Sequence, residues 1–125
     1  MENDYDNWNN LKKDTSKKER VFFDKGEIWF LSMGKNIGDE EDGKNQNFER
    51  PVLITRKFNN NVFLGVPLTS QPKEGKYYFT LESFKGSTAI LSQIKLFDAK
   101  RLIRFIGRID KVELKTIKEK IRLII

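Results

Sequence analysis

Apolar residues in this chain come in short runs separated by glycine, proline and asparagine. Runs of this length bounded by turn residues are typical of β-strands. In the first long run, apolar side chains fall on both faces, which predicts a strand buried on two sides as in a small barrel. The predicted strands are Glu27–Met33, Arg50–Lys57, Asn61–Ser70, Lys76–Glu82, Ser87–Lys95 and Ile103–Ile109.

The C-terminal segment has a different period, which predicts a helix. Asp110 is placed to cap it, and Glu113 three residues later completes a capping-box-like pair. A single helical turn is predicted at Asp98–Leu102, with Asp98 as its N-cap. Gly107 predicts a bulge or a close approach within the last strand. The apolar stripe expected to close one face of the barrel is Leu114, Ile117, Ile121 and Ile124.

The first part of the chain is polar and reads as an extension. Residues 1–20 have apolar side chains at Tyr5, Trp8 and Leu11, a spacing that predicts a short N-terminal helix, with a frayed tail as the alternative. Residues 21–125 form the expected domain. We therefore predict a mainly β protein with helices (α+β), an SH3-like β-barrel of five to six antiparallel strands closed by a C-terminal helix.

Composition narrows the chemistry that is open to this chain. Its 125 residues suit one domain and include no cysteine and no histidine. Disulfides, thiolate metal sites and histidine acid–base catalysis are therefore excluded. No signal peptide is visible at the N-terminus, and the longest apolar run, Val62–Leu68, is too short to span a bilayer. We expect a soluble, cytoplasmic protein.

Charge is distributed unevenly. Residues 51–125 carry fifteen basic and six acidic side chains, whereas residues 21–50 carry four basic and seven acidic ones. The acidic side chains gather in the irregular segment 34–49, whose Asp39–Asp42 run cannot be buried and predicts a long solvated loop. A basic body attracts polyanions such as RNA or DNA, although a soluble lysine-rich protein without such a partner has the same composition.

Strand counting brings two polar side chains together. If Asn59 and Asn60 form a two-residue turn, Arg50 lies opposite Thr69 at the open end of the hairpin. A three-residue turn would instead place Ser70 opposite Arg50. The structural alternative is an ordinary strand-end arginine beside a turn threonine.

The chain resembles the PemK/MazF family of toxins from toxin–antitoxin pairs over about residues 26–124. The likeness depends on several motifs in one order, which together are specific. They are Gly26-Glu27-Ile28-Trp29, Gly38-Asp39-Glu40, Arg50-Pro51-Val52-Leu53-Ile54, Pro67-Leu68-Thr69-Ser70-Gln71, Leu91-Ser92-Gln93-Ile94-Lys95 and Ile106-Gly107-Arg108-Ile109 with the closing helix.

This resemblance implies a homodimeric toxin that cleaves single-stranded RNA sequence-selectively, by attack of the 2′-hydroxyl and without a metal or cofactor. It also implies a cognate antitoxin whose acidic tail covers the RNA groove, and DNA binding in complex with that antitoxin. By the family pattern, Arg50 and Thr69 are the catalytic pair. The RNA-binding residues it suggests are Glu40, Ser70, Gln71, Gln93 and Lys95.

The chain departs from the family pattern at the general base. Some members carry an acidic residue immediately before the glutamine of the fifth strand, where this chain has Ser92. Glu40 or a water molecule held by Arg50 and Thr69 are the remaining candidates. The six residues between Gly43 and Arg50 also make a longer connection than is usual in the family.

Further side chains are candidates for RNA contact. Arg56 could add to the cationic surface, and Trp29 and Phe48 are candidates for base stacking, although the strand pattern favours the core for Trp29. Two other functions remain open: a barrel that binds a protein partner without catalysis, as the related CcdB-like gyrase poisons do, and a plain nucleic-acid-binding barrel.

Overall fold

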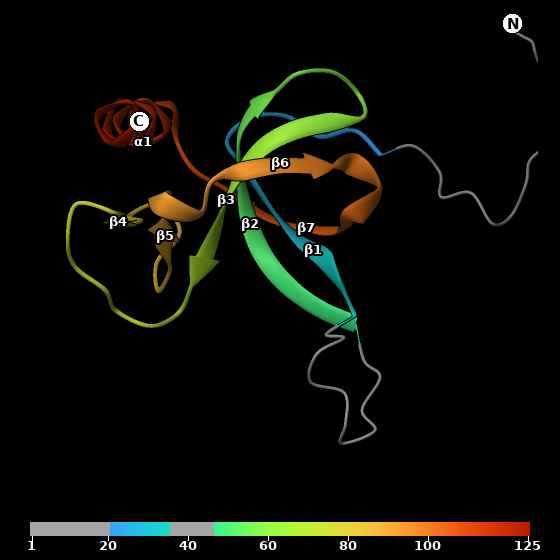
Figure 1. Cartoon of the computed structure of the whole chain (residues 1–125), viewed down its shortest axis with the longest axis horizontal. Coiled ribbons are helices and arrows are strands. Elements are labelled where there is room, and N and C mark those ends of the chain that lie inside the picture. Colours follow the sequence, from blue (N-terminus) through green and yellow to red (C-terminus); the bar gives the residue numbers. More distant parts are fainter. Residues whose placement is uncertain (1–20, 36–46) are drawn as a thin grey trace, which may run out of the picture.

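The computed structural model describes residues 21–35 and 47–125, which form strands, two 3₁₀ turns and one α-helix (Figure 1). The predicted N-terminal helix within residues 1–20, and the acidic loop with Glu40, lie outside the described residues. The elements are β1 (Glu27–Lys35), β2 (Asn47–Lys57), β3 (Val62–Thr69), β4 (Tyr78–Thr80), β5 (Thr88–Ile90), η2 (Leu91–Gln93), β6 (Lys95–Asp98), η3 (Ala99–Arg101), β7 (Leu102–Arg108) and α1 (Lys111–Ile124).

The strands pair antiparallel in the order β4-β5-β3-β2-β1-β7, and β6 also pairs with β3. The predicted fold class, mainly β with a C-terminal helix, is confirmed. Among the described residues the sheet has seven strands and does not close on itself. The reason is that η3 joins β6 to β7, while these strands pair with β3 and β1 rather than with each other. Among these residues β7 is therefore the last strand in the order of the sheet.

The turn between β2 and β3 is one residue longer than predicted. The backbone N–H of Phe58 donates to the carbonyl of Val62 at 3.1 Å, which encloses a three-residue loop, Asn59–Asn61. Asn59 stabilises this loop with its own side chain, because its Oδ1 accepts from the backbone N–H groups of Asn61 at 2.7 Å and Val62 at 2.9 Å. A regular ladder from this turn would place Ser70 opposite Arg50.

A bulge at Thr55 restores the predicted register, and the same register continued past the last pair, Val52–Pro67, would place Arg50 opposite Thr69. Next to the turn Lys57 pairs with Phe63, but beyond the bulge Ile54 pairs with Gly65 and Val52 with Pro67, a shift of one residue. Thr55 is the extra residue of β2. Its buried hydroxyl donates to the carbonyl of Leu64 at 2.9 Å, so the bulge keeps its polar group paired.

The outer edge of β3 is shared between two strands. β6 pairs with Val62–Gly65, and β5 pairs with Leu68 and Thr69. The intervening chain leaves the sheet as η2, so the single strand predicted over Ser87–Lys95 is wrong. Pro67 lies in the gap between the two pairings, and proline has no N–H to donate to a ladder. Pairing along this outer edge of β3 thus stops at Pro67, which pairs with Val52 on its other side.

Two buried clusters hold the fold together. One lies between the sheet and α1, where Leu114, Ile117 and Ile121 pack with residues such as Ile28 and Leu53. The predicted helical stripe is confirmed, with Ile124 partly buried at its end. The other cluster consists of Phe23, Trp29, Leu31, Val52, Ile54, Phe63, Phe97 and Leu102. Trp29 is 7% exposed and is therefore a core residue, as its strand pattern favours.

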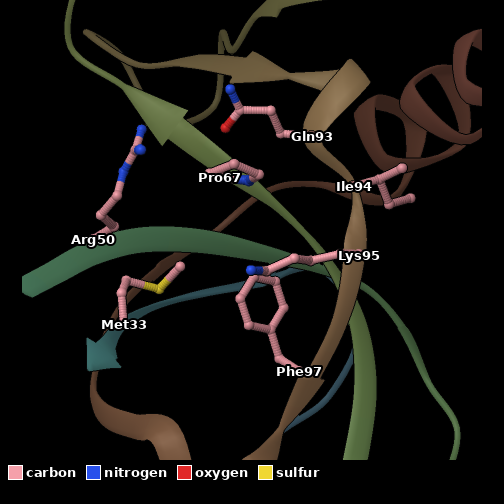
Figure 2. A pocket seen from close by; sticks show the side chains of 7 residues that line it. All are labelled: Met33, Arg50, Pro67, Gln93, Ile94, Lys95 and Phe97. Carbon is pink, nitrogen blue, oxygen red and sulfur yellow. The ribbon is translucent and has the colours of Figure 1, made fainter. Parts of the chain in front are cut away.

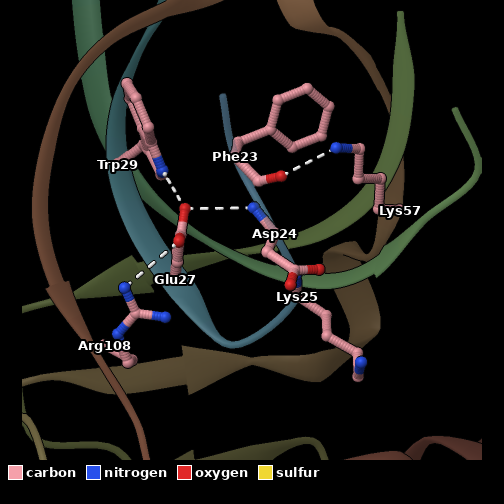
Figure 3. Close-up of polar contacts among 7 residues, drawn as sticks. All are labelled: Phe23, Asp24, Lys25, Glu27, Trp29, Lys57 and Arg108. Atoms are coloured by element: carbon pink, nitrogen blue, oxygen red, sulfur yellow. Dashed lines mark hydrogen bonds and ion pairs between the residues drawn. The ribbon is translucent and has the colours of Figure 1, made fainter. Parts of the chain in front are cut away.

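Glu27 is a buried carboxylate whose oxygens are fully engaged (Figure 3). Its Oε1 accepts from Trp29 Nε1 and from the backbone N–H of Asp24, both at 3.0 Å. Its Oε2 forms an ion pair with Arg108 Nη2 at 3.3 Å. Buried carboxylates are tolerated when hydrogen bonds and an opposite charge replace water. Glu27 therefore joins the start of β1 to the end of β7.

Glu113 has a different role from the one predicted. Asp110 caps α1 as expected, since its Oδ1 accepts from Glu113 N at 2.8 Å. The Glu113 carboxylate, however, does not return to the backbone of Asp110. It accepts from the backbone N–H groups of Glu82 at 2.6 Å and Ser83 at 3.1 Å, and from the Ser83 hydroxyl. The Ser83 oxygen in turn accepts from Asp110 N at 3.3 Å. This carboxylate thus ties α1 to the turn after β4.

Gly107 is both a bulge neighbour and a point of close approach. The register of β1 and β7 shifts next to the pair Ile28–Gly107, and a Cβ on Gly107 would lie 2.5 Å from the ring of Phe84. We expect Gly107→Ala to lower the free energy of unfolding by about 1–3 kcal/mol, the usual cost of overpacking. Urea titration measures it. Adding Phe84→Leu should recover part of the loss, and equal losses with and without it would contradict a clash with this ring.

Candidate active site

The gap in the edge of β3 opens into a hollow of about 360 Å³ (Figure 2). The break in pairing at Pro67 and the departure of η2 from the sheet together leave this space uncovered. Side chains from four strands, from η2 and from the residue that follows η2 surround it. The lining residues are Met33, Arg50, Pro67, Gln93, Ile94, Lys95 and Phe97.

Arg50 supplies the guanidinium group of this hollow. The side chain extends from β2 towards the end of β3 (Figure 2). Its Nη2 donates to the carbonyl of Leu68 at 3.4 Å. Among residues 21–35 and 47–125, the ion pair that the structure shows joins Glu27 to Arg108. No carboxylate of these residues forms an ion pair with Arg50. Arg50 is half-buried. Its remaining N–H donors are available to an anionic ligand in the hollow.

Thr69 is the last residue of β3 and directly follows Leu68, the residue that Arg50 contacts. Its Oγ1 accepts from the backbone N–H of Gln71 at 3.2 Å. This hydrogen bond uses a lone pair and leaves the hydroxyl proton to donate to a ligand. The two predicted residues therefore lie at the same end of the hairpin, one as a fixed cation and the other as a hydroxyl donor.

The other predicted residues fall into three places. Gln93, at the end of η2, and Lys95, at the start of β6, line the hollow. Ser70 and Gln71 are exposed just beyond β3 and are not among its lining residues. Glu40 lies outside the described residues, as does the side chain of Phe48. Arg56 is not in this hollow, because it extends over the ring of Phe58 at 5.4 Å.

Sequence reasoning missed the apolar side of the hollow. Met33, Pro67 and Phe97 line it beside the polar groups, and Lys95 Nζ lies 5.2 Å from the centre of the Phe97 ring. Pro67 carries the one signal that could have revealed the site. A proline within a predicted central strand marks a break in the ladder, and a break exposes the neighbouring side chains.

Two classes of feature are not found within the described residues. The residues that the structure describes contain no group of three or more acidic side chains that could hold a metal ion, and the chain has no histidine or cysteine. No helix among them is long and apolar enough to cross a membrane.

Comparison with known families tests the resemblance directly. Residues 24–125 match the family described as PemK-like, MazF-like toxin of type II toxin–antitoxin system. The chain belongs to this toxin family. The match begins at residue 24, close to the predicted start of the PemK/MazF domain at residue 21. The match does not test this boundary, which stays a prediction.

Solved structures agree with this family at the level of the fold. The PemK/MazF chain is similar to a chain of the MazE–MazF complex from Deinococcus radiodurans, with a TM-score of 0.67 and 18% identity over 81% of this chain and 93% of that one. MazF alone from the same organism is similar with a TM-score of 0.66 and 18% identity, over 83% of this chain and 96% of that one. A third similar structure is an endoribonuclease in complex with its cognate antitoxin, from a mycobacterial species. Its TM-score is 0.65 and its identity 11%, over 82% of this chain and 93% of that one. Curated protein sequences give no match.

Proposed function

We propose that this PemK/MazF-family toxin is a sequence-selective endoribonuclease that cleaves single-stranded RNA in the cytoplasm without a metal ion. The observation that carries the proposal is the placement of the Arg50 guanidinium on the wall of an open hollow, 3.4 Å from the carbonyl of Leu68, the residue before Thr69; Thr69 itself is not one of the lining residues. One of the similar structures is an endoribonuclease, which supports the same activity at the level of the family.

The chemistry requires charge stabilisation more than a covalent group from the protein. The 2′-oxygen of RNA attacks the adjacent phosphorus and the bond to the 5′-oxygen breaks, which gives a 2′,3′-cyclic phosphate and a 5′-hydroxyl. The planar fork of Arg50 suits two non-bridging phosphate oxygens, whose negative charge grows in the transition state. The Thr69 hydroxyl donates to the same group, and Lys95 neutralises a neighbouring phosphate.

Proton transfer is the weaker part of the site. One proton must leave the 2′-hydroxyl and one must reach the 5′-oxygen, and arginine stays protonated throughout. Ser92 is exposed in η2 and is no base. We propose that a water molecule held between Arg50 and Thr69 accepts the first proton, with Glu40 as the alternative, and that the protonated acceptor then gives a proton to the departing 5′-oxygen. A rate that rises with pH near 4 to 5 would indicate a carboxylate such as Glu40, whose ordinary pKa is about 4.3.

Partners are part of the proposal. The similar structures include a MazE–MazF complex and an endoribonuclease with its cognate antitoxin. We propose that this chain likewise forms a homodimer and binds an antitoxin of its own, which also links it to DNA. The predicted RNA contacts of Gln93, Ser70 and Gln71 belong here too, because amide and hydroxyl groups can read the edges of unpaired bases.

The experiment is incubation of the purified chain with a long single-stranded transcript in EDTA. We expect discrete fragments with cyclic phosphate ends, which mapping of the cut sites would convert into a recognition sequence. Binding of the transcript without cutting would support a plain nucleic-acid-binding barrel. Intact RNA together with inhibited DNA supercoiling by gyrase would support the non-catalytic alternative.

Lys95 gives a separate prediction about binding. In the cleavage-deficient Arg50→Ala background, Lys95→Ala should weaken binding of a single-stranded oligonucleotide and make its salt dependence shallower. Each neutralised phosphate contributes a slope of about −0.7 in log K against log salt concentration. Fluorescence anisotropy over a salt series measures both quantities. Lys85→Ala, an exposed lysine in a turn away from the hollow, is the control and should leave the slope unchanged.

A further inference from the structure

Phe23 fixes the place where the first residues of the chain join the domain. Its side chain is 3% exposed, and its ring centre lies 5.4 Å from that of Phe63. Its carbonyl accepts from Lys57 Nζ at 2.9 Å, and the same Nζ lies 4.5 Å from the centre of the Phe23 ring (Figure 3). Ring packing and this hydrogen bond hold the backbone to the sheet, so residues 1–20 are attached at a fixed point.

This point of attachment is close to the candidate active site. Phe63 packs in turn on Phe97, with 5.6 Å between the ring centres, and Phe97 lines the hollow of that site. Val21 and Met33 pack against the same buried cluster, and Met33 lines the hollow as well. Two ring-to-ring contacts therefore lead from the anchored Phe23 to the wall of the site.

A smaller hollow of about 170 Å³ continues the candidate active site along β6. The two hollows share three lining residues, which are Met33, Lys95 and Phe97. The complete lining of the smaller one is Met33, Lys95, Leu96, Phe97, Asp98 and Arg101. We call it the β6 hollow. A ligand that extends beyond the candidate active site in this direction would enter it.

Two cations of the β6 hollow keep donors for a ligand. Arg101 Nη1 donates to the carbonyl of Ser32 at 3.0 Å, which holds the guanidinium in place. The Asp98 carboxylate accepts from the backbone N–H of Lys100 at 2.8 Å. Within the described part of the chain, no carboxylate forms an ion pair with Lys95 or Arg101. Most of their N–H donors are therefore open to carboxylate or phosphate oxygens.

The first eleven residues of the chain have a chemistry that suits this surface. They include no basic side chain, whereas residues 12–20 carry five basic and two acidic ones. Their acidic and apolar side chains after Met1 are Glu2, Asp4, Tyr5, Asp6, Trp8 and Leu11. An acidic segment with aromatic side chains is complementary to cations beside an apolar wall, and the basic residues that follow it are repelled from the same cations.

The connection between this segment and the domain is long enough to reach both hollows. Residues 12–20 are nine residues, which span about 30 Å when fully extended. The distance to cover is short, because Phe23 is only two ring contacts from the candidate active site. A short connection gives an effective concentration on the order of millimolar, so contacts too weak to join separate molecules are sufficient here.

We propose that residues 1–11 dock on the β6 hollow and the candidate active site of their own chain and compete there with RNA. Their carboxylates would bind Lys95 and Arg101, in place of phosphate groups. The Trp8 ring would lie on the apolar wall beside Phe97, where an unpaired base would otherwise lie. The toxin would thus restrain its own activity. The competition rests on the proposed function, whereas the docking does not.

The first experiment measures docking in the absence of RNA. Because the chain has no cysteine, Asn3→Cys gives a single site for a nitroxide spin label on the full chain. We expect the label to broaden the amide NMR signals of Lys95 and Arg101. Lys85 is the internal control, because its turn between β4 and β5 lies on the opposite side of Figure 1 from η3. High salt and Trp8→Ala should each reduce the broadening.

The second experiment measures competition in the cleavage-deficient Arg50→Ala background. Trp8→Ala leaves the net charge unchanged, and we expect it to tighten binding of a single-stranded oligonucleotide about three- to tenfold. Docking in about 70–90% of the molecules lowers the apparent affinity by that factor, because RNA binds only the open fraction. Fluorescence anisotropy at constant salt measures the affinity.

Charge neutralisation provides a matched comparison in the same assay. A triple variant that removes the three carboxylates of the segment should tighten binding at least as much as Trp8→Ala does. Its changes are Glu2→Gln, Asp4→Asn and Asp6→Asn. The control removes three carboxylates outside the segment and should tighten binding less. Its changes are Asp14→Asn, Glu19→Gln and Glu119→Gln.

Several results would overturn the inference. Sharp signals for Lys95 and Arg101 would show that the segment does not dock. Equal broadening with the spin label and the isotope on different molecules would assign the docked segment to a second copy. Unchanged or weaker oligonucleotide binding by Trp8→Ala would exclude competition. If no variant binds the oligonucleotide while the broadening persists, the proposed function and the competition are both wrong, and the docking alone stands.

Discussion

Arg50→Ala is expected to lower the rate of RNA cleavage in EDTA by about a hundred- to a thousandfold, the usual cost of removing one group that stabilises transition-state charge. Arg50→Lys should recover only part of this loss, because an ammonium keeps the charge but cannot grip two phosphate oxygens with a planar fork. Single-turnover cleavage of a labelled oligonucleotide, with enzyme in excess, measures the chemical step for each variant.

The matched control for this experiment is Arg104→Ala. Arg104 is an exposed arginine on β7 whose guanidinium lies 4.4 Å from the centre of the Phe30 ring, and it takes no part in the hollow. The Arg104→Ala variant should cleave RNA at a rate within about twofold of the parent rate. Urea midpoints of all variants would show that they are folded. Cleavage by Arg50→Ala at the parent rate would refute the proposed site even if the chain is a nuclease.

Glu113→Ala is expected to produce the largest loss of stability, about 2–4 kcal/mol of the free energy of unfolding. The change removes the acceptor for the backbone N–H groups of Glu82 and Ser83 and for the Ser83 hydroxyl. Each part-buried donor left without a partner costs about 1–3 kcal/mol, and water reaching this turn recovers some of that sum. Equilibrium urea titration at neutral pH measures the difference.

Glu119→Ala provides the comparison on the same helix. Glu119 is exposed and makes none of the hydrogen bonds that Glu113 makes, so its loss should change stability by no more than about 0.5 kcal/mol. Glu113→Gln should lie between the two, because an amide keeps one acceptor oxygen. If Glu113→Ala and Glu119→Ala unfold at the same urea concentration, the tie between α1 and the turn after β4 contributes nothing to stability.

Local patterns were sufficient to predict most elements of the fold, with the segment Ser87–Lys95 as the exception. The helical stripe ends in a buried face, and Asp98 caps a short turn by accepting from the backbone N–H of Lys100 at 2.8 Å. The single strand predicted over Ser87–Lys95 was wrong because the chain leaves the sheet within this segment, as η2. The apolar residues before and after η2 each fit a strand, so their pattern does not reveal the break. Nothing within that segment records that its partner, β3, has Pro67 at the corresponding place.

The candidate site was predictable in part for a similar reason. The turn was one residue longer than expected, and the bulge at Thr55 shifted the ladder back by the same amount. Thr55 carries no sequence signal for a bulge, since a β-branched residue is common at any position of a strand. Gln93 and Lys95 reach the hollow only because η2 leaves the sheet, which depends on the sharing of the β3 edge between β5 and β6.

The open sheet has one consequence for the behaviour of the free protein in solution. Within the described residues β7 is the last strand in the order of the sheet, and a border of that kind is a template on which a second molecule can add its own strand, an addition that exposed Ile103 and Phe105 would favour. Arg104 lies between these two residues, so a second molecule that added the same strand would bring two Arg104 guanidinium groups close together. We therefore expect Arg104 to disfavour strand addition at this border, as distinct from the proposed homodimer, and concentrated salt to weaken that repulsion.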